Sequence, residues 1–283
     1  MKVRVIQTGY FKLDGGAMFG IVPKRLWTKL NPPDEQNLCT WAMRCLLVET
    51  DKRTILIDTG IGHKQDAKFR SHFAPFGEET LLTSLAQQNI EPQAITDVIL
   101  THLHFDHCGG ALYRNEAGEI VPTFPNATYW TNEKHFNWAM QPNEREKASF
   151  LKENFVPLQK AGVLQYIKVR QYARFCPEIK IFFTYGHTEA MMLPYIKVGD
   201  KTLVYCADTL PSSYHIGMPY IMSYDIRPLD TLNEKNQLLE QAADEGHILF
   251  FEHDPVVECA TVKRNEQGRV VLNETFKLAE IFQ

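Results

Sequence analysis

The sequence is poor in cysteine and has no long apolar run. Its six cysteines are scattered over 283 residues and none forms a C-x-x-C pair, whereas a fold held by disulfides needs denser cysteine in a shorter chain. We therefore expect buried thiols. No stretch reaches the roughly 20 apolar residues that a membrane helix requires, and residues 1–7 lack the apolar run of a signal peptide. These absences predict a cytoplasmic protein without a membrane partner.

Basic runs, repeats and flexible linkers are missing too. Thirty Lys and Arg stand against 34 Asp and Glu, and no basic cluster of the kind that binds phosphate backbones is present. We therefore expect no nucleic-acid partner and a small-molecule substrate instead. Because no linker rich in Pro, Gly or Ser divides the chain, we expect residues 1–283 to form a single α/β domain.

Short runs rich in β-branched residues, separated by turn residues, predict strands. These runs are 3–10, 45–49, 54–58, 98–100, 179–184, 195–198, 202–206 and 248–251. A helix is predicted from Thr80 to Asn89, and residues 132–162 are predicted to be mostly helical. The best-marked helix is expected to begin at a capping box formed by Thr231 and Glu234 and to end at Gly246.

The segment 101–110, T-H-L-H-F-D-H-C-G-G, carries the strongest chemical signal. Three histidines and an aspartate lie within six residues, directly after an apolar strand. In an extended chain, side chains two positions apart point the same way, so His102 and His104 can bind one cation together. Asp106 and His107 lie past the turn and can bind a second cation. Neutral imidazole and carboxylate are the ligands of hydrolytic zinc sites.

A polar loop with clustered histidines is the alternative interpretation of this segment. An unmetallated cluster is costly to bury and has no purpose on the surface, so the metal interpretation is favoured.

The segment T-H-x-H-x-D-H-x-G-G resembles the signature of the metallo-β-lactamase superfamily, and other segments resemble its remaining motifs in order. These segments are D-T-G at 58–60, G-H-T at 186–188, C-A-D-T at 206–209 and F-F-E-H-D at 250–254. The resemblance implies the four-layer αβ/βα sandwich of that superfamily. It also implies that Asp58 steadies a ligand rather than binding metal itself.

The resemblance further implies that seven side chains hold two divalent metal ions. They are His102, His104 and His187 for the first ion, Asp106, His107 and His253 for the second, and Asp208 as the bridge. Taken singly, His187, Asp208 and His253 could be a turn residue, a helix cap and a surface residue. Together they follow predicted strands in the order of the family motifs, which favours the site interpretation. Zinc is the expected metal, and manganese, iron and cobalt are alternatives. The expected activity is hydrolysis by a metal-bridging hydroxide, with Asp106 as the catalytic group that orients the hydroxide and passes a proton to the leaving group.

Within the superfamily, the chain looks similar to the quorum-quenching N-acyl homoserine lactonases and related organophosphate hydrolases. The leader D-G-G-A-M-F-G at 14–20 resembles theirs, so Met18 and Phe19 are candidates for an apolar wall of the pocket, with core packing as the alternative. One position departs from the pattern. Pro211 stands where the lactonases have a tyrosine that contacts the substrate carbonyl.

The substrate donor therefore has to come from another residue, and the candidates are Tyr214, His215 and Tyr224. We expect a lactonase or related esterase. A phosphotriesterase acting on organophosphates, or a metal-binding protein of the same fold without catalysis, are the alternatives. The aromatic stretch 130–150 is compatible with core packing, a lid or the interface of a homodimer.

Overall fold

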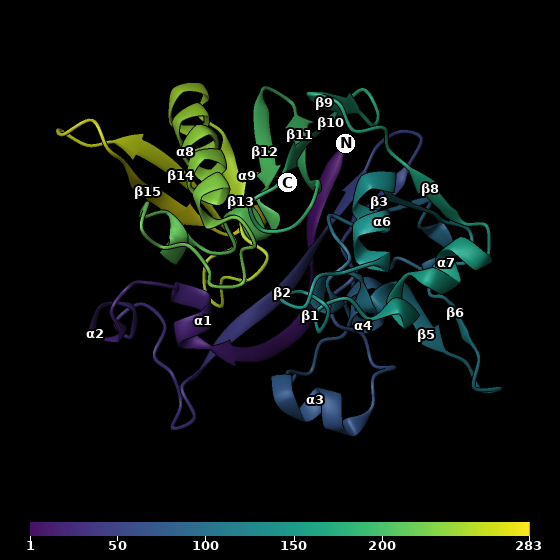
Figure 1. The fold of residues 1–283 in the computed structure, drawn as a ribbon. Coiled ribbons are helices and arrows are strands. Elements are labelled where there is room, and N and C mark those ends of the chain that lie inside the picture. The colour runs from purple at the N-terminus through teal and green to yellow at the C-terminus, as the bar shows by residue number, and fades with distance from the viewer. Residues whose placement is uncertain (283) are drawn as a thin grey trace. The chain divides into compact units, whose positions relative to one another are not determined.

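The computed structural model describes residues 1–282, which fold as two compact units (Figure 1). The first unit comprises residues 1–9 and 43–173, and the second comprises residues 10–42 and 174–282. Two long strands, β1 (Lys2–Asp14) and β2 (Leu38–Glu49), each contribute residues to both units. The expectation of a single domain stays a prediction.

A sheet in the order β1-β2-β3-β4-β7-β8 forms the frame of the first unit. Its further strands are β3 (Thr54–Ile57), β4 (Asp97–Ile99), β7 (Thr128–Thr131) and β8 (Leu164–Tyr166). From β3 to β8 the strands are parallel. A separate hairpin pairs β5 (Leu112–Arg114) with β6 (Ile120–Pro122). Parallel strands expose their carboxyl ends at one edge, and this edge is where the loop after β4 begins.

Helices cover this sheet and supply its core. They are α4 (Leu81–Gln87), α5 (Phe105–Cys108), α6 (Glu133–Met140) and α7 (Val156–Lys160), whereas α3 (Ala67–Phe73) of the same unit has no buried residue. Leu85 of α4, Phe136 of α6 and Leu158 of α7 belong to one buried cluster with strand residues such as Leu56 and Val98. Burial of apolar area of this kind is the main stabilising contribution to such a unit. The core therefore holds β4, and with it the start of the histidine segment.

The second unit is built on a sheet in the order β15-β14-β13-β12-β11-β10-β9. The strands are β9 (Tyr172–Arg174), β10 (Ile179–Thr184), β11 (Met191–Val198), β12 (Lys201–Tyr205), β13 (Ile248–Phe250), β14 (Cys259–Arg264) and β15 (Val270–Phe276). Strands β12 and β13 are parallel, with Tyr205 opposite Phe250. The residues that follow these two strands, Asp208 and His253, therefore leave the sheet at the same edge.

The helices of the second unit are α1 (Gly15–Phe19), α2 (Lys24–Trp27), α8 (Pro228–Glu245) and α9 (Leu278–Ile281). The long helix α8 packs on β14 and β15 (Figure 1). It ends at Gly246, whose φ of 67° is the left-handed C-cap that the sequence predicts. Its beginning differs, because Pro228 starts the helix three residues before the predicted capping box.

The middle of the chain is less helical than the sequence predicts. Between residues 132 and 162 the helical elements are α6, the short 3-10 helix η3 (Lys152–Asn154) and α7, with turns between them. Helix α6 stops at Met140 because Gln141 precedes Pro142, and a residue before proline disfavours the α conformation. The strand predictions were more accurate, and β10 has the predicted bounds.

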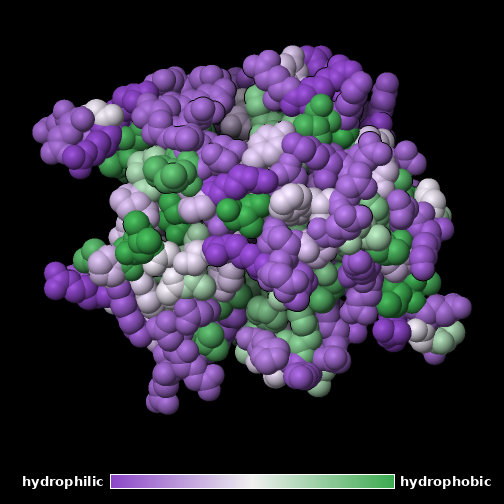
Figure 2. Space-filling view, viewed as in Figure 1, coloured by the Kyte–Doolittle hydropathy of each residue, from purple (hydrophilic) through white to green (hydrophobic). Residues whose placement is uncertain are grey.

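The surface and the cysteines agree with the composition. Hydrophilic residues cover most of the face drawn in Figure 2, and the apolar residues form separate patches. All six cysteines are buried, which confirms the expectation of buried thiols. Among the helices of residues 1–282, none combines the length and the apolar character needed to cross a membrane.

Candidate metal centre

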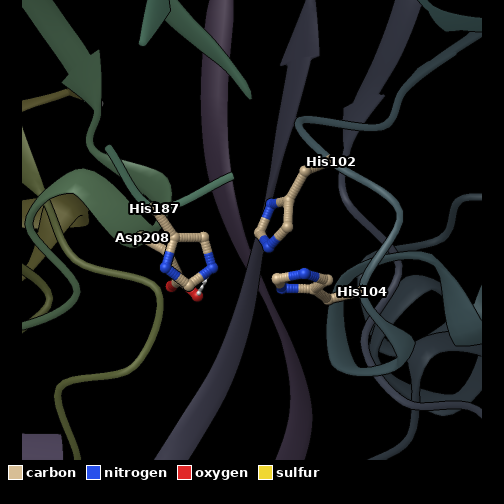
Figure 3. A group of neighbouring side chains, drawn as sticks. All are labelled: His102, His104, His187 and Asp208. Atoms are coloured by element: carbon tan, nitrogen blue, oxygen red, sulfur yellow. Dashed lines mark ion pairs between the residues drawn. The ribbon is translucent and has the colours of Figure 1, made fainter. Parts of the chain in front are cut away.

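Buried imidazoles and carboxylates in both units could hold metal ions. We call His102, His104, Asp106 and His107 of the first unit the His102 cluster, and His187, Asp208 and His253 of the second unit the Asp208 cluster. Figure 3 draws the side chains of His102, His104, His187 and Asp208.

The His102 cluster lies on the loop between β4 and α5 and on α5 itself. His102 and His107 are completely buried, and their ring centroids are 3.9 Å apart. The ring centroids of His102 and His104 are 4.5 Å apart. Burying imidazole nitrogens is costly unless each one forms a hydrogen bond or binds a cation. The structure therefore brings together the residues that the spacing in the sequence predicts for the first unit.

Asp58, at the end of β3, orients two of these histidines. Its Oδ2 accepts hydrogen bonds from the Thr101 hydroxyl (2.6 Å) and from His107 Nδ1 (3.1 Å). Thr101 has given its only hydroxyl hydrogen to Asp58, so its oxygen accepts from His102 Nδ1 (3.1 Å). Both rings then carry their hydrogen on Nδ1, which leaves the Nε2 lone pair to bind metal.

The backbone around Asp58 is unusual in two respects. Asp58 itself has a φ of 58°, a left-handed conformation that is uncommon outside glycine and is found at functional sites. The turn that follows it, residues 59–61, packs directly against Gly109 and Gly110 of the histidine segment. A Cβ at Gly109 would lie 2.1 Å from the Ile61 carbonyl oxygen, and one at Gly110 would lie 2.2 Å from that of Thr59. Glycine is therefore required at both positions.

Glu146 is a neighbour of His104 that the sequence interpretation missed. It lies in the turns after α6 and is buried, and its Oε1 is 3.8 Å from His104 Nε2. Its Oε2 accepts from Trp138 Nε1 (2.8 Å) and Asn143 Nδ2 (2.6 Å), which hold the carboxylate in place. Only the fold shows that this carboxylate lies beside His104.

Asp208 lies between the two histidines of its own cluster. Its Oδ2 is 3.1 Å from His187 Nε2, and its Oδ1 is 3.1 Å from His253 Nε2. The preceding residue, Ala207, has a φ of 42°, a strained conformation for alanine that turns the chain after β12. Each oxygen of one carboxylate therefore faces a different histidine.

His187 is held by a carboxylate that the sequence did not indicate. Its Nδ1 donates to Asp225 Oδ1 at 2.8 Å, so Nε2 is again the nitrogen that faces Asp208. Burial lowers the pKa of His187, but the carboxylates of Asp208 and Asp225 outweigh it and raise the pKa to about 10. Asp225 lies 38 residues after His187 in an irregular loop, without a motif that could have identified it.

The beginning of α8 supports the His187 loop. Glu234 accepts hydrogen bonds from the backbone N–H groups of Tyr185 (2.7 Å) and Gly186 (3.0 Å). The predicted capping box at Thr231 and Glu234 is therefore wrong, since the Glu234 carboxylate binds the His187 loop instead. A Cβ at Gly186 would lie 2.2 Å from Thr231 Oγ1, so the helix and the loop are in direct contact.

His253 is held by the backbone and by its neighbour in sequence. Its Nδ1 donates to the carbonyl oxygen of Ala42 at 2.8 Å. Asp254, completely buried, accepts through Oδ2 from the N–H (2.9 Å) and the hydroxyl of Ser213. These hydrogen bonds join the segment after β13, which carries His253, to the 3-10 turn η5 (Ser213–His215).

The residues proposed from the sequence for substrate contact have different surroundings. Met18 and Phe19 are buried in the second unit, where Phe19 stacks on Trp27 and His215. This is the core-packing alternative, and a role as a pocket wall stays a prediction. Tyr214 is half-buried against Trp41, and Tyr224 is exposed. Their roles as substrate donors stay predictions as well.

His215 uses both ring nitrogens within the protein. A carbonyl oxygen can only accept, so His215 Nε2 donates to the Met18 carbonyl at 2.9 Å. Its Nδ1 then accepts from the Ser212 hydroxyl at 2.7 Å. This arrangement requires a neutral ring, and burial lowers the pKa of His215 to about 4. His215 therefore ties helix α1 to η5.

Comparison with known proteins agrees with these motifs. The family model described as the metallo-beta-lactamase superfamily matches residues 44–253. The N-acyl homoserine lactonase AiiA of Bacillus thuringiensis subsp. kurstaki is 25% identical over 238 residues, which cover 80% of this chain and 85% of that protein.

Solved structures show the same fold. A probable metal-dependent hydrolase from Staphylococcus aureus superposes with a TM-score of 0.84 at 27% identity, covering 97% of this chain and 98% of the other. AidC, described as a dizinc quorum-quenching lactonase, superposes with a TM-score of 0.77 at 21% identity, covering 97% of this chain and 95% of the other. These matches confirm the α/β sandwich expected from the sequence. The chain belongs to the metallo-beta-lactamase superfamily and is a metal-dependent hydrolase of that family.

Proposed function

We propose that this chain is a dinuclear metal-dependent hydrolase that opens lactones, with N-acyl homoserine lactones as the first substrates to test. The observation that carries the dinuclear centre is the placement of Asp208, whose two oxygens each lie 3.1 Å from Nε2 of a different histidine. A carboxylate held in this way is suited to bridge two cations, one beside each histidine. The similarity to the N-acyl homoserine lactonase AiiA supports the substrate class.

The side chains present fit two divalent ions. In four of the histidines Nδ1 donates within the protein, to Thr101, Asp58, Asp225 or Ala42, and Nε2 is left as the ligand atom. Fixing the tautomer through a second hydrogen bond is typical of metal-binding histidine. Nitrogen and carboxylate oxygen together suit zinc first, and also manganese, iron or cobalt.

We assign the ligands as the motifs predict. His102, His104 and His187 would hold one ion, Asp106, His107 and His253 the other, and Asp208 both. When bound, the ions would lower the pKa of a water molecule from 15.7 to roughly 7 and polarise the bond to be split. The contribution of the protein is to hold the ligand rings rigidly and to keep bulk water away, since every one of these side chains is buried.

Asp106 is the group we assign to proton transfer. It lies in the first turn of α5, its side chain is 11% exposed, and its Oδ2 is 3.8 Å from His107 Nε2. A carboxylate oxygen in this position can accept a proton from the attacking water and later donate it to the leaving oxygen. Such transfer contributes typically 10²–10⁴-fold to a rate, by order of magnitude.

The test combines metal analysis with a substrate panel. Protein loaded with zinc or manganese is expected to contain two ions per chain and to hydrolyse N-acyl homoserine lactones. The hydrolysis is measured by titrating the acid that it releases. The same protein is offered p-nitrophenyl esters and organophosphate triesters. Full metal occupancy without turnover of any lactone would contradict the proposal.

A phosphotriesterase is the second candidate, because Pro211 weakens the argument for a lactone substrate. Proline has no side-chain donor to offer a lactone carbonyl at the position where lactonases have tyrosine. Faster hydrolysis of organophosphate triesters than of lactones by the same metal-loaded sample would decide for this candidate.

A further inference from the structure

Lys235 of α8 lies at the centre of a ring of backbone carbonyl groups. Its side chain is buried, and its Nζ donates to the carbonyl oxygens of His215 (3.1 Å), Gly217 (3.0 Å), Met218 (3.0 Å) and Tyr220 (2.9 Å). An ammonium group has three hydrogens, so four acceptors around it share them. Beyond His215, the last residue of η5, the segment has no helix or strand, and the Gly217 carbonyl also accepts from the N–H of Tyr220 at 3.0 Å. Lys235 supplies the donors that a sheet or helix would otherwise supply.

The segment that Lys235 holds is part of a longer loop, residues 212–225, which contacts α1 at two places. At one end His215 donates to the Met18 carbonyl. At the other end Ser223 N donates to the Ala17 carbonyl at 2.7 Å, and a Cβ at Gly20 would lie 2.1 Å from the Ile221 carbonyl oxygen. The position of α1 therefore depends on the conformation of this loop.

The same loop holds two parts of the Asp208 cluster. Asp225, at its end, accepts from His187 Nδ1, and Ser213, near its start, donates to the Asp254 carboxylate next to His253. The carbonyls that Lys235 contacts, at residues 215–220, lie between these two attachment points along the loop. A change in the middle of the loop would therefore reach both histidines.

We propose that Lys235 is a positioning residue, whose ammonium holds residues 215–220 so that Asp225 and Ser213 keep His187 and His253 in place to bind metal. This inference rests on the proposed metal centre. Lys235 itself contacts backbone carbonyls and no predicted ligand. A buried ammonium is costly unless it is fully hydrogen-bonded, and the four carbonyl oxygens provide that compensation.

The test compares two substitutions in α8. Lys235→Met keeps a similar length and apolar stem but has no donor. Leu239→Ala changes another buried residue of α8, and it removes packing without removing a side-chain hydrogen bond. Both variants and the wild type are titrated with Zn²⁺ against a competing chelator, and hydrogen exchange is measured across residues 212–225.

Lys235→Met is expected to bind Zn²⁺ about tenfold more weakly, the range typical for lost support of a ligand, and to exchange faster at residues 215–223. Leu239→Ala is expected to lose stability while both of these quantities stay near the wild-type values. Unchanged Zn²⁺ affinity and unchanged exchange in Lys235→Met would overturn the inference. Failure of the wild type to bind Zn²⁺ would instead contradict the proposed function.

If Lys235→Met does not fold, Lys235→Ala is measured with methylammonium chloride and with sodium chloride at equal ionic strength. Methylammonium can enter the space left by the side chain and donate to the same carbonyls. Recovery of Zn²⁺ binding and of slow exchange with methylammonium alone supports the inference, and equal behaviour in both salts overturns it.

Discussion

The two clusters orient their histidines by the same principle but with different partners. In the His102 cluster one carboxylate serves two rings, because Asp58 binds His107 directly and His102 through Thr101. In the Asp208 cluster each ring has its own acceptor, Asp225 for His187 and a backbone carbonyl for His253. The first arrangement concentrates the support in one side chain, whereas the second distributes it over separate segments. Equivalent substitutions are therefore expected to have unequal effects in the two clusters.

The largest loss of metal binding and activity is expected from substitution of Asp208, because no other carboxylate of its cluster faces both histidines. Asp208→Ala removes the carboxylate that faces both His187 and His253, so bound metal and hydrolytic activity should be lost together, with affinity reduced more than about 100-fold. Elemental analysis and a lactone assay measure the two losses. Asp200→Ala, an exposed aspartate in the same unit, serves as control. A metal-replete, fully active Asp208→Ala protein would refute the bridging role.

The supporting carboxylates give the direct comparison between the clusters. Asp58→Ala should weaken Zn²⁺ binding by about 100-fold because two histidines lose their orientation, and Asp225→Ala by about tenfold because one does; both values lie in the range known for such partners. Competition with a chelator measures both affinities on the same scale. Equal losses in the two variants would show that Asp58 acts on one histidine only.

The surroundings of the Asp208 cluster should also respond to acid. The folded-state pKa of His215 is about 4, below its ordinary value of 6.5, so between these values the unfolded chain binds the additional proton. Stability is therefore fully present above pH 6.5 and falls as the pH falls, by about 2 kcal/mol at pH 5. Urea unfolding at pH 7 and pH 5 measures this. In His215→Phe the free energy of unfolding should fall by about 2 kcal/mol less between pH 7 and pH 5 than in the wild type. The same pH dependence in this variant as in the wild type would contradict the lowered pKa of His215.

The smallest effect is expected away from both clusters. Gly162 in the first unit and Gly246 in the second have φ values of 73° and 67°, and a Cβ added at either position would meet open space. Alanine there should cost about 1 kcal/mol through backbone strain alone, with unchanged Zn²⁺ affinity. Thermal unfolding measures the first quantity and titration the second. A loss of affinity in either variant would show that metal binding follows general stability.

The difference between the clusters also explains which site residues the sequence could predict. His102, His104, Asp106 and His107 lie within six residues, so their spacing alone indicates a metal site. His187 and His253 were found from their positions after predicted strands and from the family resemblance. Asp225 and Glu146 were not predicted, because their contacts with His187 and His104 join residues 38 and 42 positions apart without a local pattern.

The sequence by itself determined the strands β1 to β4 and β10 to β13, the mixed α/β class, the superfamily and the identity of the candidate ligands, because periodicity and short motifs are local properties of the chain. Apart from Asp58, which the family resemblance predicted, only the tertiary structure decided what supports those ligands. It placed Glu234 on the His187 loop instead of in a capping box, gave both ring nitrogens of His215 internal partners, and surrounded Lys235 with four carbonyl oxygens. These contacts form between segments distant in the chain, so packing decides them and local preference does not.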